Sequence, residues 1–94
     1  MPRYVIERDI PEIGSANQSE LREAANKSNA VLASMKIKQK NIQWEHSYIA
    51  DNKTFCIYIA DNKDLLREHA EQSGFPATVI TQVSHMVDPV TAEA

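Results

Sequence analysis

Apolar and polar residues follow two different periods along the first third of the chain. Residues 3–8 are rich in β-forming side chains, and Pro11 and Gly14 follow them, which predicts a first strand that ends in a loop. From Leu21 to Met35, apolar or small residues recur three and four positions apart, which predicts one helix of about five turns. The chain is therefore expected to open with a strand and an amphipathic helix.

Two short strings compete for the start of this helix. Asn17 with Glu20 three residues later is typical of a capping box, and Ser15 with Gln18 has the same spacing. In a capping box the two side chains bind each other's backbone N–H groups, which the first turn of a helix otherwise leaves free. Either start leads into the same apolar stripe.

The string YIADNK occurs twice, at residues 48–53 and 58–63. The last three residues of its first copy, residues 51–53, separate residues 42–50 from residues 54–59, two runs of aromatic and β-branched residues that predict strands. Because Asp and Asn tolerate left-handed backbone angles, this copy is predicted to form a hairpin turn. The second copy leads into a helical pattern, so the repeat needs no duplication to explain it.

A second helix and a fourth strand are predicted after the second copy. Asp61 is a typical N-cap residue, and residues 64–70 have the helical pattern. Gly74 is expected to end the helix, with Pro76 just beyond it. Residues 78–87 alternate loosely between apolar and polar, which suits a strand.

This order of elements is typical of the α+β ferredoxin-like βαββαβ fold, with two helices on one face of a four-stranded antiparallel sheet. We expect residues 1–94 to form a single domain of this kind, ordered over about residues 2–88, with a flexible tail over residues 89–94. A chain this small usually hides the other face of the sheet, so we expect a homodimer, a protein partner or a bound ligand there.

Composition and charge narrow the class of function. The 94 residues are 43% hydrophobic and carry a net charge of −3, which is typical of a soluble globular protein and argues against nucleic-acid binding. The local basic cluster of Lys36, Lys38 and Lys40 is better explained as a solvated helix end than as a phosphate site. We expect neither a membrane span nor a signal segment. The single cysteine, Cys56, excludes an internal disulfide and fits the reducing cytoplasm, where we expect the protein.

Several side chains could carry chemistry, but no standard catalytic signature joins them. They are Glu7, Glu45, His46, Ser47, Cys56, Tyr58, His69, His85 and Asp88. A nucleophile pair would need Cys56 beside His46, one strand away, whereas a cysteine that serves as a small buried hydrophobe is much commoner. Binding is therefore favoured over catalysis.

The register of the hairpin decides which of these side chains share a face. With a two-residue turn at Asp51 and Asn52, His46 pairs with Ile57. One face then holds Trp44, His46, Tyr48, Phe55, Ile57 and Ile59, and the open face holds Glu45, Ser47, Cys56 and Tyr58. With a three-residue turn, His46 pairs with Tyr58, and the open face holds Trp44, His46, Tyr48, Cys56 and Tyr58. Turn chemistry slightly favours the shorter turn, because Lys53 suits the left-handed position of the longer loop poorly.

Imidazole, thiolate and carboxylate groups are the donors that borderline ions such as Ni²⁺ and Zn²⁺ prefer. The same side chains are also suited to purely structural roles. His69 lies on or beside the apolar stripe of the second helix, where a half-buried, hydrogen-bonded histidine is commoner than a ligand. Trp44, Tyr48 and Tyr58 are better interpreted as core or interface aromatics than as a ligand cage.

Most of the chain resembles a family of short bacterial single-domain proteins that includes nickel-binding ferredoxin-like members. The matching segments are MPRYVIER, then WEHSYIADNKTFCIY followed by Ala60, and LREHAEQSGFPATVITQV running on to Val87, Asp88 and Pro89. The last two segments are fairly specific, whereas the long first helix matches only in pattern.

The resemblance implies a dimer of ferredoxin-like subunits and, for some members, bound nickel. His46, Cys56 and His69 lie within the matching segments and have suitable chemistry, so we predict them as metal ligands. Carboxylates such as Glu7, waters or the partner subunit would complete the shell. The expected function is storage or sequestration of Ni²⁺ or a similar ion. The alternative is a dimeric enzyme or small-molecule binder that uses the open sheet face as a pocket.

Overall fold

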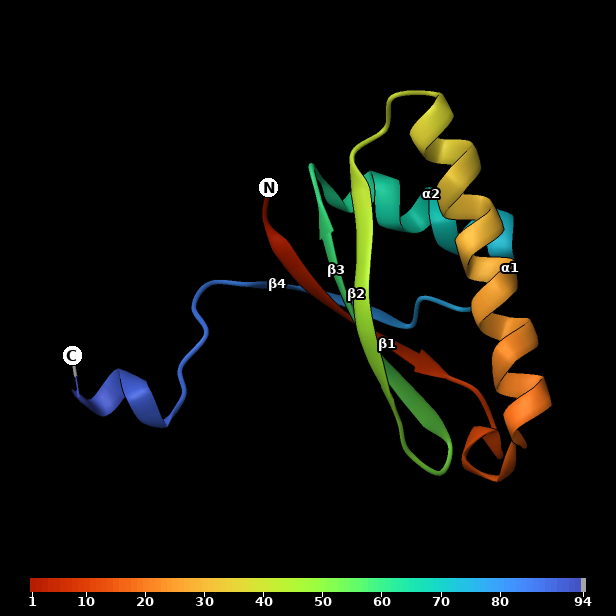
Figure 1. Ribbon diagram of the computed structural model, residues 1–94, viewed down its shortest axis with the longest axis horizontal. Coiled ribbons are helices and arrows are strands. Elements are labelled where there is room, and N and C mark those ends of the chain that lie inside the picture. Colours follow the sequence, from red (N-terminus) through yellow and green to blue (C-terminus); the bar gives the residue numbers. More distant parts are fainter. Residues whose placement is uncertain (94) are drawn as a thin grey trace.

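The computed structural model describes residues 1–93 and has two layers, a sheet and a pair of helices (Figure 1). The elements are β1 (Arg3–Asp9), η1 (Ile13–Ser15), α1 (Gln18–Ile37), β2 (Ile42–Ile49), β3 (Lys53–Ala60), α2 (Lys63–Ser73), β4 (Val79–Val83) and η2 (Pro89–Glu93). The sheet is antiparallel with the strand order β2-β3-β1-β4, and both main helices lie on one face. The predicted α+β ferredoxin-like fold is confirmed. No helix within residues 1–93 is long and apolar enough to cross a membrane.

α1 begins at the predicted capping box of Asn17 and Glu20. The Glu20 backbone N–H donates to Asn17 Oδ1 at 2.9 Å, and the Asn17 backbone N–H donates to Glu20 Oε1 at 3.0 Å. Ser15, the competing start, lies in η1 and donates its hydroxyl hydrogen to the Glu12 carbonyl oxygen at 2.8 Å. The reciprocal pair of bonds therefore sets the start of α1.

α2 begins one residue later than predicted. Its N-cap is Asn62, whose Oδ1 accepts a hydrogen bond from the Leu65 backbone N–H at 3.1 Å, so the prediction of Asp61 as N-cap is wrong. The Asp61 carboxylate instead accepts a hydrogen bond from the Asn41 amide at 2.8 Å, just before β2. The predicted end at Gly74 is confirmed, because this residue has the left-handed φ of 80° that suits glycine.

The turn between β2 and β3 has two residues, as the favoured register requires. The Ala50 backbone N–H donates to the Lys53 carbonyl oxygen at 2.9 Å, and His46 pairs with Ile57. The left-handed backbone angles expected in this turn are absent, since the residues of positive φ within the described chain lie elsewhere. The short register is thus confirmed, but the conformation of its turn differs.

The loop after β1 holds this turn in place. The Glu12 backbone N–H donates to Asn52 Oδ1, and the Gly14 backbone N–H donates to the Asp51 carbonyl oxygen, each at 2.9 Å. Gly14 approaches so closely that a Cβ there would lie 2.7 Å from the Ala50 carbonyl oxygen. Hydrogen bonds to the loop after β1 therefore stabilise this turn without the left-handed backbone angles that the sequence suggested.

The two faces of β3 are the reverse of those predicted. The residues that point towards the helices and are buried are Thr54, Cys56, Tyr58 and Ala60, whereas the half-buried side chains of the open face are Lys53, Phe55, Ile57 and Ile59. Both faces of this strand carry apolar side chains, so alternation alone could not identify the core face. Burial against the helices decides it, because Tyr4 and Ile6 of β1 pair with Tyr58 and Cys56 in the core.

A β-bulge in β2 separates two residues that were predicted to share a face. Pairing shifts between Trp44 and His46, so Glu45 is the extra residue. Trp44 consequently lies opposite Tyr58 on the covered face, whereas His46 lies opposite Ile57 on the open face. The alternation of residue types could not reveal this shift.

β4 is shorter than the predicted strand over residues 78–87. It pairs with β1, and its last pair joins Val83 to Arg3, the first residue of β1. Beyond Val83 the described chain pairs with no strand of this sheet, so it leaves the domain and leads to η2, away from the two helices (Figure 1). The flexible tail over residues 89–94 stays a prediction, and its last residue, Ala94, lies outside the described residues.

Candidate functional site

The four predicted metal ligands are distributed over both faces of the sheet. Glu7 and His46 lie on the open face, while Cys56 and His69 lie on the covered face, between the sheet and the helices. Within residues 1–93, no three His, Cys, Asp or Glu side chains are grouped so that they could hold one metal ion. A single chain therefore does not bring the predicted ligands together.

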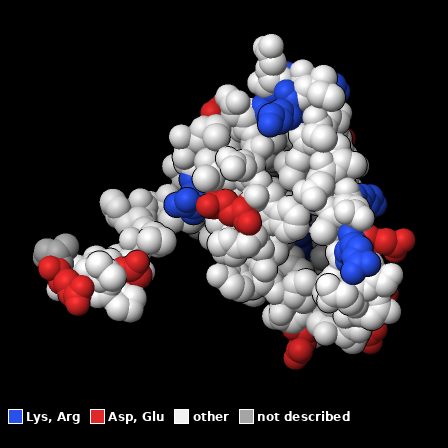
Figure 2. All heavy atoms as spheres, viewed as in Figure 1, with Lys and Arg blue, Asp and Glu red and all other residues white. Residues whose placement is uncertain are grey.

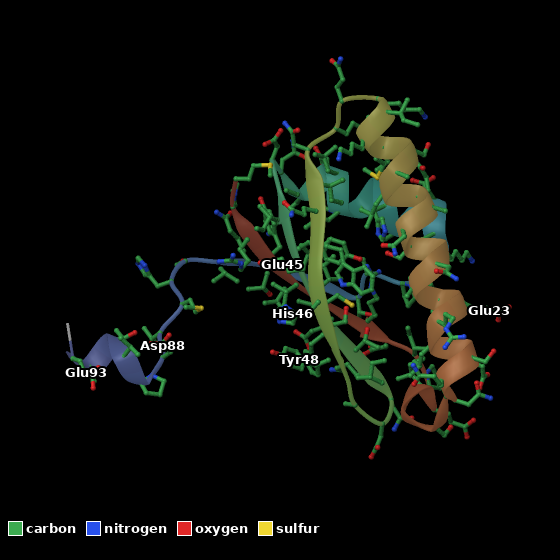
Figure 3. The ribbon with its side chains drawn as sticks, viewed as in Figure 1. Glu23, Glu45, His46, Tyr48, Asp88 and Glu93 are labelled. Atoms are coloured by element: carbon green, nitrogen blue, oxygen red, sulfur yellow. The ribbon has the colours of Figure 1, made fainter. Side chains whose placement is uncertain are left out.

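His46 presents its imidazole on the open face. Figure 3 shows Glu45, His46 and Tyr48 along β2, on the side away from α1. The His46 ring meets the Tyr48 ring edge-on, with 5.1 Å between their centroids. Glu45 accepts hydrogen bonds from Arg3 Nε at 2.6 Å and Nη2 at 3.2 Å, which lowers the pKa of the Glu45 carboxyl. The exposed imidazole thus lies beside a carboxylate that is already paired.

Two further carboxylates on the open face, those of Glu7 and Asp9, lie beside the same lysine, Lys53. Lys53 Nζ lies 3.4 Å from Glu7 Oε1 and 3.7 Å from Asp9 Oδ1. The three side chains are partly exposed, and ion pairs of this kind are weak. Glu7 could therefore exchange Lys53 for a metal ion without a large loss of stability.

His69 lies on α2 and is fully buried. Its Nε2 lies 3.1 Å from Ser28 Oγ on α1, its ring centroid lies 5.4 Å from that of Tyr58, and its Nδ1 has no hydrogen-bond partner in the described chain. Burial, together with the positive charge of Arg8, lowers the pKa of His69 to about 4. The ring is therefore neutral at pH 7, but the helices would have to move before a metal ion could reach it.

Cys56 is also buried, on β3, with its Sγ 3.6 Å from Thr54 Oγ1. Cys56 and His46 point to opposite faces, so they do not form the nucleophile pair considered from the sequence. His85 and Asp88 follow β4, where Asp88 Oδ1 accepts a hydrogen bond from the Val90 backbone N–H at 3.0 Å at the start of η2. Neither of these two residues belongs to a group of three possible metal ligands within residues 1–93.

The covered face contains a cavity that the sequence did not predict. It has a volume of ≈ 140 Å³ and lies between α1 and the sheet, where Figure 2 shows the surface hollowed between α1 and β2. Most of its lining is apolar and includes Ile10, Ile13, Leu21, Ala24, Ala25 and Ile49. Its polar and aromatic lining includes Arg8, Ser28, Trp44, Ser47, Cys56 and Tyr58. The pocket considered from the sequence was expected on the open face, so this cavity lies on the other side of the sheet.

Arg8 supplies the charge in this cavity and is only 3% exposed. Its Nη1 donates to the Pro76 carbonyl oxygen at 2.9 Å and lies 3.5 Å from that of Phe75. The guanidinium carbon lies 6.0 Å from the Tyr58 ring centroid and 5.9 Å from that of Phe75. Its Nη2 is buried and has no hydrogen-bond partner in the described chain. A cation is thus enclosed by carbonyl oxygens and ring faces.

Sequence reasoning missed Arg8, although a signal was present. Arg8 follows Tyr4 and Ile6 at intervals of two, so it lies on the same face of β1 as these core residues. A charged residue in the buried phase of a strand is uncommon and needs partners, which marks it for attention. The helix residues that enclose it could not be assigned before the faces of the sheet were known.

The fold is similar to that of a crystal structure of SCO4226 from Streptomyces coelicolor A3(2), with a TM-score of 0.72. The two chains are 17% identical over 90% of this chain and 99% of that one, so this likeness concerns the fold alone. No curated protein matches the chain. A family model described as nickel responsive protein SCO4226-like matches residues 4–83, most of the chain, and this confirms the resemblance seen in the sequence. The chain therefore belongs to the SCO4226-like family of nickel responsive proteins.

Proposed function

We propose that this protein binds Ni²⁺ or a similar divalent transition-metal ion on the open face of its sheet, for storage or sequestration. The observation that carries the proposal is the position of His46, whose exposed ring offers nitrogen donors on that face. Imidazole suits Ni²⁺, Zn²⁺ and Cu²⁺, and the family is described as nickel responsive. The cysteine is free, which fits the reducing cytoplasm that we propose as the location.

A second copy of the chain would complete the metal shell. One chain groups too few donors within its described residues, so further ligands must come from water or from another molecule. The open face carries half-buried apolar side chains in the middle of the sheet, which include Val5, Phe55, Ile57 and Ile59. Pairing two such faces in a homodimer would cover these side chains and bring a second set of donors towards His46.

The four predicted ligands have different parts in this proposal. His46 makes the first contact, and Glu7, two strands away on the same face, becomes available to a metal ion by giving up Lys53. Cys56 and His69 are buried on the covered face, so their predicted ligation requires α2 to move away from the sheet. Substitution at His46 should therefore affect the first binding step most directly.

Titration calorimetry with Ni²⁺ near pH 7 on protein freed of metal by a chelator tests this proposal. We expect saturable binding, competition from Zn²⁺ and Cu²⁺, and affinity at least about tenfold weaker in His46→Ala, since even the outer-shell partners of metal ligands contribute that much. The matched control is His85→Ala, which removes another exposed histidine and should leave the affinity unchanged.

Two outcomes would contradict the metal site. The first is no heat of binding together with no nickel retained after dialysis. The second is equal weakening by His46→Ala and His85→Ala, which would indicate scattered surface binding by histidine.

A further inference from the structure

The charge of Arg8 is not balanced by any acidic side chain around the cavity. The residues that line the cavity include neither Asp nor Glu, and Arg8 forms no ion pair within the described chain. An arginine side chain stays protonated in proteins, so the cost of burying Arg8 cannot be reduced by loss of its proton. A buried cation without a counter-ion is strongly unfavourable. An anion in the cavity would offset this penalty, and the buried Nη2, which has no acceptor within the described chain, could bond it once the Arg8 side chain turns towards the cavity.

The remainder of the lining restricts the chemistry of that anion. Ser28 and Ser47 line the cavity with Arg8, and the Ser47 hydroxyl, which accepts a hydrogen bond from Trp44 Nε1, keeps its own hydrogen to donate to a polar head. The other walls are mostly aliphatic and would reject a second charged or strongly hydrated group. The ligand therefore needs one anionic head and one apolar body.

The size of the cavity limits the apolar body. A volume of ≈ 140 Å³ is close to that of engineered cavities, about 150 Å³, that hold benzene. Ala24 and Ala25 of α1 create this space, because larger side chains at either position would occupy it. A body of about four to six carbon atoms would fit.

We propose that the cavity between α1 and the sheet binds a small apolar monocarboxylate, whose carboxylate pairs with the Arg8 guanidinium. The site lies on the face of the sheet opposite His46, so it is separate from the metal site proposed above. A carboxylate suits Arg8 because the guanidinium group can donate to its oxygens at short distance.

Trp44 provides a direct measurement of binding. It is the single tryptophan of the chain, it lines the cavity, and its Nε1 donates to Ser47 Oγ at 2.9 Å. We would titrate the protein with 3-methylbutanoate in the presence of a chelator and follow Trp44 emission. We expect a saturable change, with 3-methylbutan-1-ol binding at least about tenfold more weakly because it cannot form the charge-assisted hydrogen bond. Inorganic phosphate should not compete.

Two variants and two matched controls locate the site. Arg8→Met removes the charge and should weaken binding at least about tenfold, whereas Arg22→Met removes an exposed arginine of α1 and should have no effect. Ala25→Leu fills the cavity but keeps Arg8, so it tests the proposal even if Arg8→Met does not fold. Its control is Ala30→Leu on the exposed side of α1, which should bind like the wild type.

Several results would overturn the proposal. They are the absence of a saturable change with 3-methylbutanoate, equal affinity for the alcohol, full displacement by phosphate, and unchanged binding in a folded Arg8→Met or Ala25→Leu variant. Because the chelator is present throughout, none of these results depends on the metal site.

Discussion

Arg8 and His69 are buried polar residues that both lie close to the ring of Tyr58. Each has one nitrogen without a hydrogen-bond partner in the described chain, Nη2 of Arg8 and Nδ1 of His69. Unpartnered buried groups of this kind are rare in native proteins, because each loses its bonds to water without replacement. These two nitrogens, both close to the Tyr58 ring, are the strongest departure from ordinary core packing in the described part of the domain.

The burial of His69 predicts a pH dependence of stability. Its pKa is about 4 in the folded protein and near 6.5 when unfolded, so the unfolded chain binds more protons between these values. The free energy of unfolding therefore holds its full contribution from His69 above pH 6.5. It decreases by roughly 2–3 kcal/mol as the pH falls towards 4. Urea unfolding at a series of pH values, with chelator present, measures this decrease in the free energy of unfolding.

The matched variant for this measurement is His69→Gln, which keeps a polar group near Ser28 but does not titrate. Its free energy of unfolding should fall less than that of the wild type between pH 6.5 and 4. Parallel curves for the two proteins would show that His69 does not carry the effect.

At the scale of elements, features that depend on neighbouring residues were mostly predictable from the sequence, except the N-cap of α2 at Asn62, and features that depend on distant residues were not. The helices, the hairpin and the capping box at Asn17 were predictable because each depends on residues close in sequence. The end of β4 was not, since it depends on where β1 begins. The faces of β3 were not predictable either, because both of its faces are apolar, and the bulge at Glu45 is set by pairing between strands. The cavity was missed for the same reason, since it requires α1 and the sheet together.

The corrected start of α2 gives a test at this scale. Asn62→Ala removes the N-cap acceptor of the Leu65 N–H and should lower the free energy of unfolding by about 0.5–2 kcal/mol. Asp61→Ala removes only an exposed bond to Asn41 and should cost less than about 0.5 kcal/mol. The urea concentrations at the unfolding midpoints of the two variants give this comparison of stability directly. If Asp61→Ala lowered the free energy of unfolding more than Asn62→Ala does, Asp61 and not Asn62 would be the N-cap.

At the scale of the whole molecule, the open face of the sheet predicts self-association. Sedimentation at micromolar concentration should give twice the 10.6 kDa mass of one chain. Ile57→Lys places a charge in the middle of the open face and should yield a folded monomer, as checked by circular dichroism. Ile37→Lys changes an isoleucine that is 84% exposed at the end of α1 and should stay dimeric. A wild-type monomer of 10.6 kDa would exclude the dimer.

The most direct test of the proposed metal site is anomalous scattering at the nickel absorption edge from crystals soaked in Ni²⁺. We predict a peak within coordination distance of a ring nitrogen of His46, on the open face between two copies of the chain. A peak between the sheet and the helices, at Cys56 and His69, would contradict the open-face site, and a crystal without any nickel peak would contradict the proposed function.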